Sequence, residues 1–239
     1  MAVNSLSSRP KLLEISVETV EAALAAQRGG AHRIELCESL AVGGLTPSNE
    51  LMRLAREQLH LPIFAMIRPR DGDFLYSDSE FAQMQRAIQI AKEAAMNGVV
   101  LGVLNAGRQV DVVRTQELVN FASPLPVTFH RAFDQTPDLH AALQAVLKTG
   151  ATRLLTAGGK STAPEGAGII KELITIARNR LVVMPGRGIH GGNVASLFAE
   201  TGAREFHAGL SGVVPRPGND LPLFEREVRK LADQLKSLP

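Results

Sequence analysis

The chain has 239 residues, of which 45% are hydrophobic, 21% charged and 4% aromatic. This length suits one α/β barrel, which commonly needs about 250 residues. The 26 basic residues exceed the 24 acidic ones by two, and no cluster of five or more Lys or Arg occurs. Nucleic acid and membrane surfaces are therefore disfavoured as partners.

Cys37 is the single cysteine, so no intramolecular disulfide can form. Residues 1–10 are polar and lack the apolar core of a secretory signal. No stretch approaches the ~20 apolar residues that span a bilayer. We therefore expect a cytoplasmic protein without a membrane-spanning segment.

Short apolar runs alternate with amphipathic segments along the whole chain. Strands are expected at residues 11–16, 33–37, 63–67, 99–104, 127–130, 153–157, 181–184 and 205–208. Helices are expected at residues 20–27, 48–59, 77–96, 112–121, 138–148, 165–177 and 193–200. Many of these strands are apolar on both faces, which is typical of parallel strands covered on both sides. The pattern predicts a single (βα)₈ TIM-type barrel rather than a doubly wound sheet.

The ends of the expected helices carry turn residues. Glycines stand where helices should stop, and glycine accepts the left-handed conformation of a C-cap. These glycines are Gly29, Gly30, Gly98, Gly150 and Gly202. Beyond residue 208 a Pro/Gly loop leads to an amphipathic helix at 221–235, which should close the barrel. We expect residues 1–239 to form one barrel domain, with a C-terminal loop and helix at 209–239.

Acidic residues stand near the ends of the first two expected strands. The active site of a parallel barrel lies at the carboxyl ends of its strands. Glu14 and Glu35 occupy similar places on adjacent strands, and each can face Arg68 from the third strand. Two carboxylates near one guanidinium can differ in pKa and act as acid and base. The alternative is a structural ion-pair network inside the barrel.

Two of the six histidines, His130 and His207, end expected strands. His130 is followed by Arg131 and, four residues on, by Asp134. A histidine with a nearby carboxylate can act as a general base or hold a metal, and the alternative is a histidine satisfied in the core. The candidate catalytic residues are Glu14, Glu35, Arg68, His130 and Asp134.

Glycine turns follow the sixth and seventh expected strands. Their N–H groups can cradle an anion, and phosphate sites of barrels commonly use the loops after strands seven and eight. Glycine also serves any tight turn between a strand and a helix, so an ordinary turn is the alternative. The candidate residues for binding an anionic substrate are Arg70, Gly158, Gly159, Gly186, Arg187 and Gly188.

Several motifs resemble the CutC or copper homeostasis protein family, from about residue 12 to residue 208. The motifs are RIELC (33–37), GGLTPS (43–48), MIRPR (66–70), GDFLYS (72–77), TFHRAFD (128–134), LTAGG (155–159), MPG (184–186) and EFH (205–207). The resemblance implies a TIM-type barrel, a cytoplasmic location and a part in copper handling.

Cys37 matches a cysteine of that family, and its thiolate can bind a soft metal such as Cu(I). Family members often carry another cysteine at the end of the first strand, where this chain has Ser16. We therefore take Cys37 and His207 as candidate metal ligands for Cu(I), and expect the monomer to bind copper weakly.

Two hypotheses for the function follow. The first is a protein of copper homeostasis that binds copper. The second is a barrel enzyme that acts on a small anionic molecule, phosphorylated or sugar-like, by carboxylate and histidine acid–base chemistry. A homo-oligomer is compatible with both hypotheses, whereas a non-catalytic interaction scaffold, which needs an exposed apolar patch, is a third alternative.

Overall fold

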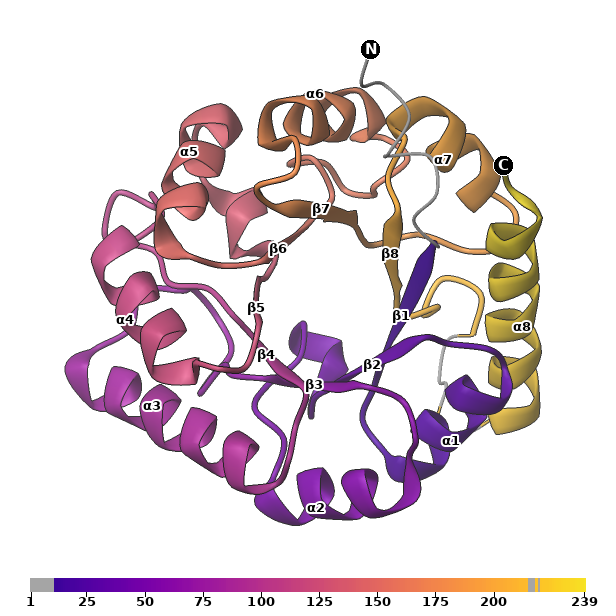
Figure 1. Ribbon diagram of the computed structural model, residues 1–239, viewed down its shortest axis with the longest axis horizontal. Coiled ribbons are helices and arrows are strands. Elements are labelled where there is room, and N and C mark those ends of the chain that lie inside the picture. Colours follow the sequence, from indigo (N-terminus) through magenta and orange to yellow (C-terminus); the bar gives the residue numbers. More distant parts are fainter. Residues whose placement is uncertain (1–10, 215–217, 219) are drawn as a thin grey trace.

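The structure is a computed structural model that describes residues 11–214, 218 and 220–239. In this part of the chain, eight parallel strands form a ring that is surrounded by helices (Figure 1). The predicted TIM-type barrel is therefore confirmed. None of the described helices is long and apolar enough to cross a membrane.

The strands and helices agree with the predicted ones to within a few residues. The strands are β1 (Leu12–Val17), β2 (Arg33–Leu36), β3 (Ile63–Met66), β4 (Gly98–Leu101), β5 (Val127–Phe129), β6 (Arg153–Thr156), β7 (Val182–Pro185) and β8 (Glu205–Ala208). The helices are α1 (Val20–Arg28), α2 (Asn49–Gln58), α3 (Asp78–Glu93), α4 (Val112–Ala122), α5 (Leu139–Thr149), α6 (Ala167–Ala177), α7 (Val194–Thr201) and α8 (Leu221–Ser237). Two short 3₁₀ helices that the sequence did not predict, η1 (Leu40–Val42) and η2 (Arg131–Gln135), follow β2 and β5.

The strand order is β7-β6-β5-β4-β3-β2-β1-β8, so the two ends of the sheet are β7 and β8. Within the described residues one parallel bridge, between Gly186 and His207, joins these two strands and closes the ring. A Cβ atom on Gly186 would lie 2.5 Å from Leu155 Cδ1. A larger residue here would require the buried Leu155 side chain to move.

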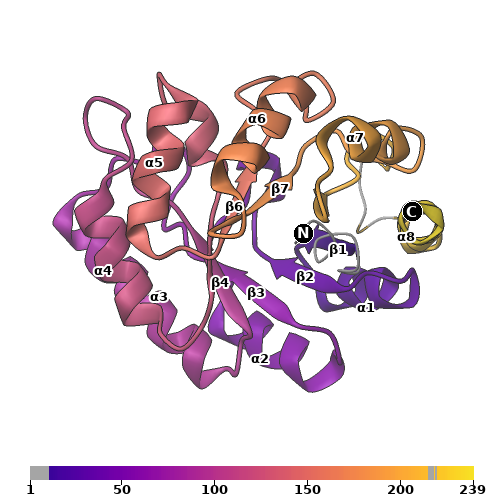
Figure 2. The ribbon, with the colours of Figure 1, turned by 45° about the horizontal axis from the view of Figure 1, so that its top comes forward.

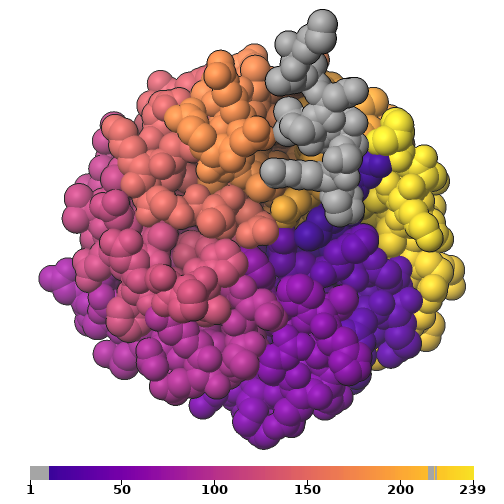
Figure 3. Space-filling model, viewed as in Figure 1, coloured from indigo at the N-terminus to yellow at the C-terminus, as the bar shows by residue number. Residues whose placement is uncertain are grey.

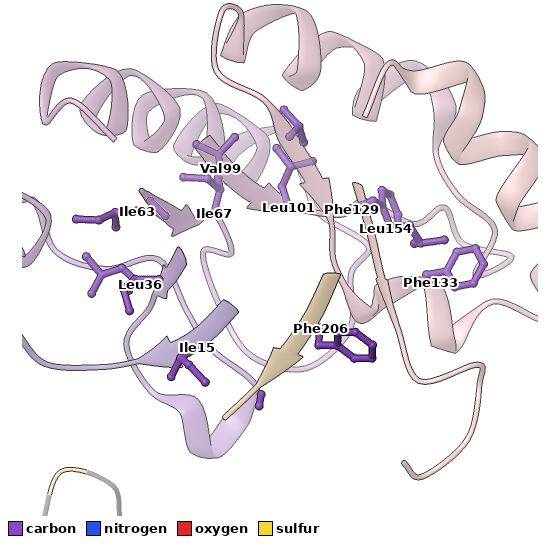
Figure 4. Close-up of a cluster of buried hydrophobic side chains, with 14 of the residues drawn as sticks. Ile15, Leu36, Ile63, Ile67, Val99, Leu101, Phe129, Phe133, Leu154 and Phe206 are labelled. Atoms are coloured by element: carbon purple, nitrogen blue, oxygen red, sulfur yellow. The ribbon is translucent and has the colours of Figure 1, made fainter. Parts of the chain in front are cut away.

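Alternate residues of each strand point to opposite sides of the barrel wall. The outward residues are apolar and pack beneath the helices, as Val99, Leu101 and Phe129 do in Figure 4. Full burial of one such side chain contributes about 1.5–3 kcal/mol to folding. The inward residues are mostly polar or aromatic, and side chains fill the centre of the ring in the space-filling view (Figure 3).

Helix α8 lies beside α1 and α7 and completes the outer layer, as predicted (Figures 1 and 2). Its inward face carries residues spaced three or four apart, as expected of an amphipathic helix. These buried residues are Phe224, Val228, Leu231 and Leu235. An ion pair of 2.8 Å between Arg28 and Glu225 links α1 to the exposed side of α8.

Gly30, Gly150 and Gly202 adopt positive φ after their helices, as predicted. The prediction for Gly98 was wrong, because the positive φ after α3 belongs to Ala95 (φ 54°) and Gly98 is the first residue of β4. A Cβ atom on Gly98 would lie 2.5 Å from Phe64 Cζ. The glycine therefore makes room for the Phe64 ring inside the barrel and does not cap a helix.

Candidate functional site

A cavity of about 1780 Å³ opens at the carboxyl ends of the strands. Its walls come from the loops after most strands, including η1, η2 and the loops after β6, β7 and β8. Eight of the residues predicted from the sequence line it: Glu35, Arg68, His130, Asp134, Gly159, Arg187, Gly188 and His207. The predicted convergence at one end of the barrel is thus present for these residues.

Below the cavity lies a layer of paired charges, which we call the lower layer. It consists of Glu14, Arg33, Arg153 and Glu205, with the Phe64 ring against both guanidinium groups at 4.8 Å and 5.4 Å. Arg33 Nε donates to Glu14 Oε2, and Arg33 Nη2 donates to Glu205 Oε2 at 2.8 Å. Arg153 Nε donates to the same oxygen at 2.9 Å. Each of these four charges therefore has an opposite charge beside it.

Arg68 was expected to face both carboxylates, but Glu14 pairs instead with Arg33, which the sequence patterns did not single out. Arg68 forms no ion pair with Glu14 or Glu35 among the described residues, so the expectation was wrong for both. Glu14 pairs in register with Arg33 on β2 and with His207 on β8, so all three side chains lie at one level of the barrel. The period of two in the segment RIEL was the available signal, because it points Arg33 to the same side of β2 as Glu35.

A second group, Glu14, His207 and Glu35, connects the lower layer to the cavity. His207 Nδ1 lies 2.8 Å from Glu14 Oε1, and His207 Nε2 lies 3.8 Å from Glu35 Oε2. The first distance is that of a hydrogen bond and the second is too long for one. Glu14 therefore orients the imidazole, while Glu35 stands beside its other nitrogen.

The environment separates the pKa values of these three groups. Burial would raise the pKa of Glu14, but Arg33 and His207 outweigh burial and lower it to about 2. Burial raises the pKa of Glu35, His207 opposes this and Glu14 adds to it, and the result is about 7. Burial would lower the pKa of His207, but Glu35 and Glu14 raise it above its usual value. At neutral pH, Glu14 is ionised and Glu35 is near its titration midpoint, and the raised pKa of His207 favours its protonated imidazole.

Glu35 is 3% exposed, and its Oε1 atom has no hydrogen-bond partner among the described residues. Buried polar atoms without a partner are rare in folded proteins, and each calls for an explanation. Since Glu35 also lines the cavity, a bound molecule can supply the missing partner.

The Arg68 side chain forms hydrogen bonds with the loops around the cavity. Its guanidinium donates to the carbonyl oxygens of Val42, Gly44 and Gly72 at 2.8–3.2 Å and lies 4.9 Å from the Phe74 ring centroid. These bonds connect the loop that contains η1 to the loop after β3. Arg68 Nε is buried without a partner among the described residues.

His130 ends β5 and is 4% exposed, with its ring centroid 4.8 Å from that of Phe74. Its Nδ1 accepts a hydrogen bond of 3.3 Å from the backbone N–H of Ala132. Burial, with a further contribution from the nearby Arg68, lowers the pKa of His130 to about 3. The ring is therefore neutral and only weakly basic at pH 7, and this weak basicity does not suit the general base that the sequence suggested.

Asp134 does not bond to His130, and its carboxylate is held elsewhere. It accepts hydrogen bonds from Thr156 Oγ1 at 2.5 Å, from the N–H groups of Ala157 and Gly159 at about 3.0 Å, and from Arg131 Nε at 3.0 Å. The expected pairing of His130 with Asp134 was therefore wrong. The glycine turn after β6 does cradle an anion, but the anion is the side chain of Asp134.

The other predicted anion-binding residues divide into two groups. Gly158 donates its N–H to Thr156 Oγ1 and Gly186 donates to Thr156 O, so both amides are already used within the chain. Arg70 pairs with Asp73 and Glu80 and does not line the cavity. The contacts of these three residues therefore do not support the predicted anion site. Arg187 and Gly188 remain at the rim, beside Gly209 and Ser211 from the loop after β8.

Cys37 is fully buried against Phe64, Met66 and Val100, and its thiol donates to Val17 O at 3.6 Å. Burial raises the pKa of this thiol, and Glu35 raises it further. Among the described residues, Glu14, Glu35 and His207 form the cluster whose ligand atoms lie within 4.8 Å of one another. Cys37 is not part of it, so the predicted pair of metal ligands, Cys37 and His207, is not joined in one cluster.

The model of the CutC family matches residues 11–212. The chain belongs to the CutC family. A family protein CutC from Chromobacterium violaceum is 46% identical over 204 residues, which cover 85% of this chain and 83% of that protein. The copper homeostasis protein cutC homolog from Homo sapiens is 46% identical over 196 residues, which cover 82% and 72% of the two chains.

The same family includes a solved structure. The crystal structure of the copper homeostasis protein CutC from Streptococcus agalactiae has a TM-score of 0.79 and 32% identity to this chain, and covers 83% of this chain and 98% of that one. The resemblance noted in the motifs is therefore confirmed.

Proposed function

We propose that this CutC family member is an enzyme that transfers protons on a small molecule bound in the cavity, with Glu35 as the acid–base group. One observation carries the proposal: a buried carboxyl group with a pKa of about 7 and an unpartnered oxygen lines a large cavity. A pKa near the working pH lets one carboxyl group both accept and return a proton.

The groups beneath Glu35 would support this chemistry. Arg33 keeps Glu14 ionised, and Glu14 holds the ring of His207 and raises its pKa. A positive charge on His207, whose Nε2 lies 3.8 Å from Glu35 Oε2, stabilises the carboxylate form of Glu35. In the absence of His207, burial and Glu14 would both favour the protonated form of Glu35, which cannot act as a base.

An anionic substrate is supported by the basic residues of the cavity wall. Arg131, Lys160 and Arg187 line the cavity in addition to Arg68. The loops after β7 and β8 contribute Gly188 and Gly209, and barrel enzymes often bind phosphate there. We propose that a phosphorylated or sugar-like molecule binds with its charged group toward these two loops.

Deuterium exchange tests the proposal without knowledge of the product. The protein is incubated in D₂O with a panel of small phosphorylated and carboxylated metabolites, and uptake of deuterium at carbon is measured by mass spectrometry. We expect wild type to label at least one compound and Glu35→Gln to be slower by about 10²–10⁴-fold. Glu50→Gln, at an exposed residue of α2, is the control. Equal labelling by wild type and Glu35→Gln, or none by wild type, would contradict the proposal.

A role in copper homeostasis is the second candidate, because the human and mouse relatives bear that name. Cu(I) prefers sulfur ligands, and this chain offers one thiol, which is buried, hydrogen-bonded and raised in pKa. These residues do not fit a tight Cu(I) site in a monomer. We propose that copper, as cargo, is bound weakly. We also propose that the protein is cytoplasmic and that the Cys37 thiol stays reduced there.

Titration of Cu(I) against a competing chelator tests this second candidate. We expect weak binding that Cys37→Ala abolishes, with Ser16→Cys strengthening it, because a second thiol on β1 would face the same interior. Tight stoichiometric binding by the wild-type monomer would contradict the expected weakness. Binding that is unchanged in Cys37→Ala would remove Cys37 from the site.

A further inference from the structure

We infer that His130 is a neutral hydrogen-bond donor that contacts a carbonyl or enolate oxygen of the substrate through Nε2–H, and that the substrate is a carbonyl compound. The inference rests on the proposed proton transfer by Glu35. It gives His130 a role different from the acid–base role that the sequence suggested.

The backbone decides which ring nitrogen of His130 carries the proton. The N–H of Ala132, at the start of η2, points to Nδ1 at 3.3 Å. A nitrogen that accepts a hydrogen bond has no proton of its own, so the single proton of the neutral ring is on Nε2. The turn into η2 thereby fixes the tautomer in the unliganded protein.

The surroundings of the ring oppose a second proton. The charged groups that act on His130 are the guanidinium groups of Arg68 and Arg131, and both disfavour a positive charge on the ring. The Phe74 ring packs against the imidazole, and Gly102 leaves the space that the imidazole fills, since a Cβ atom there would lie 2.6 Å from Nδ1. The ring is therefore held in one place as a donor.

His130 Nε2 has no hydrogen-bond partner among the described residues, although it is buried and His130 lines the cavity. Two further atoms in residues of the same wall share this condition, Arg68 Nε and Glu35 Oε1. His130 and Arg68 follow β5 and β3, and Glu35 lies on β2, so the two donors and the acid–base oxygen belong to residues that line one cavity. A ligand that satisfies all three offers an oxygen to the donors and a proton to the carboxylate.

A carbonyl compound with a hydrogen on the adjacent carbon meets these requirements. Glu35 takes the proton of that carbon, the C–H electron pair becomes the C=C bond of the enolate, and the carbonyl oxygen receives the negative charge. His130 Nε2–H and the Arg68 cation stabilise that charge, and Glu35 then returns the proton to carbon. Donors placed where charge develops commonly contribute a large part of catalysis. A neutral imidazole keeps its proton during the reaction, so Glu35 alone carries the transferred proton.

Nitrogen NMR of histidine labelled with ¹⁵N tests the state of His130 directly, with assignment by comparison with His130→Gln. We expect a neutral ring protonated on Nε2 from pH 5 to pH 9. A charged ring at pH 7, or a proton on Nδ1, would overturn the inference whatever the substrate is.

The deuterium assay tests the contact with substrate. We expect label on the carbon next to a carbonyl group, a loss of about 10²–10³-fold in His130→Ala, and partial recovery in His130→Gln, whose amide N–H₂ replaces Nε2–H. The pH profile of His130→Gln should match that of wild type, because no proton is transferred by the ring. A merely structural role of the ring would not give recovery by glutamine.

The two proposals fail in different ways. Labelling that depends on Glu35 but not on His130, or that occurs on a carbon without an adjacent carbonyl, overturns the role of His130 and leaves proton transfer by Glu35 standing. Labelling that survives in Glu35→Gln overturns the proposed function itself.

Discussion

The lower layer and the cavity wall above it contain the same kinds of residue, but the charged groups are paired in the lower layer and several polar atoms are unpaired in the wall. In the lower layer, Arg33 lies between Glu14 and Glu205, and every charged group has a partner. In the wall above, polar atoms of Glu35, Arg68 and His130 are buried without partners among the described residues. The two regions are adjacent levels of one barrel.

The difference separates stability from function. A buried charge is tolerable when it is paired, and removal of one partner from such a pair is costly. An unpartnered buried group costs stability, and its use by a ligand or a reaction is one explanation for its presence. Loss of a group should therefore destabilise the lower layer, whereas loss of the unpartnered Glu35 carboxyl group should leave the protein as stable as before or more so.

The largest effect is expected from Arg33→Met. The substitution leaves Glu14 and the Glu205–Arg153 pair without their central cation, so we expect a loss of about 3–5 kcal/mol in the free energy of unfolding. Urea unfolding at pH 7 measures this loss. Arg53→Met, which removes an exposed ion pair with Glu57, should cost no more than about 0.5 kcal/mol. Similar costs for the two variants would contradict the distinction.

The pH dependence of stability should report Glu35. Its pKa rises from 4.5 in the unfolded chain to about 7 in the folded one, so the folded state binds more protons between these values. Stability must then fall as pH rises through this window. The raised pKa of His207 also makes stability fall as pH rises. The lowered pKa of Glu14 contributes stability that is present above pH 4.5 and is lost as pH falls below that value.

We expect Glu35→Gln to remove much of this fall, on the order of 2 kcal/mol between pH 5 and pH 7.5. Urea unfolding of both proteins across the window measures it. An equally steep fall in the variant would show that Glu35 titrates normally in the folded state and would undermine its proposed role.

A smaller effect is expected from Gly98→Ala. The added methyl group would lie 2.5 Å from the Phe64 ring, which packs against Arg33 and Arg153, so the lower layer must shift. We expect a loss of about 1–3 kcal/mol. Gly168→Ala in α6 meets no atom within 4 Å and should instead stabilise the helix by about 0.5–1 kcal/mol. Thermal unfolding of both variants makes the comparison, and a neutral Gly98→Ala would refute the close contact.

A last comparison distinguishes two buried threonines. Thr128 Oγ1 on β5 has no partner among the described residues, whereas Thr156 Oγ1 on β6 donates to Asp134 at 2.5 Å. We expect Thr128→Val to be neutral or slightly stabilising, and Thr156→Val to cost about 1.5–3 kcal/mol, because it removes a hydrogen bond to a charged group. The reverse order in urea unfolding would mean that Thr128 has a partner that the structure does not show.

Much of the fold could be predicted from the sequence because burial leaves a local pattern. The apolar runs of parallel strands and the spacing of helical faces are visible in short windows, which is why the strand ends were placed within a few residues. The same logic found Glu35, His130 and His207 at the cavity. The positions of strand ends identify the end of the barrel that holds the cavity, even when the contacts of each side chain are unknown.

The partners of these residues could not be predicted, because they depend on the stagger between strands. Glu14 meets Arg33 and His207 since β1 is shifted relative to β2 and β8, and this shift leaves no mark in the sequence of any one strand. The cradle around Asp134 depends on η2, a single turn that follows β5 and brings the carboxylate to the loop after β6. The prediction that Gly98 caps a helix was wrong for the same reason, because the residue that requires glycine there, Phe64, belongs to another strand.

The seam between β7 and β8 has a structural consequence. In the described chain, β8 matches β1 over four register pairs but meets β7 at one bridge, so β8 is joined more extensively to the N-terminal strand than to β7. His207 stands on β8 and its partner Glu14 on β1, so the ion pair lies on one side of the joint. Arg187 and Gly188 follow β7, on the other side. The contact between Glu14 and His207 is therefore made within the extensively paired β1–β8 part of the ring, whereas Arg187 and Gly188 follow the strand that one bridge joins to it.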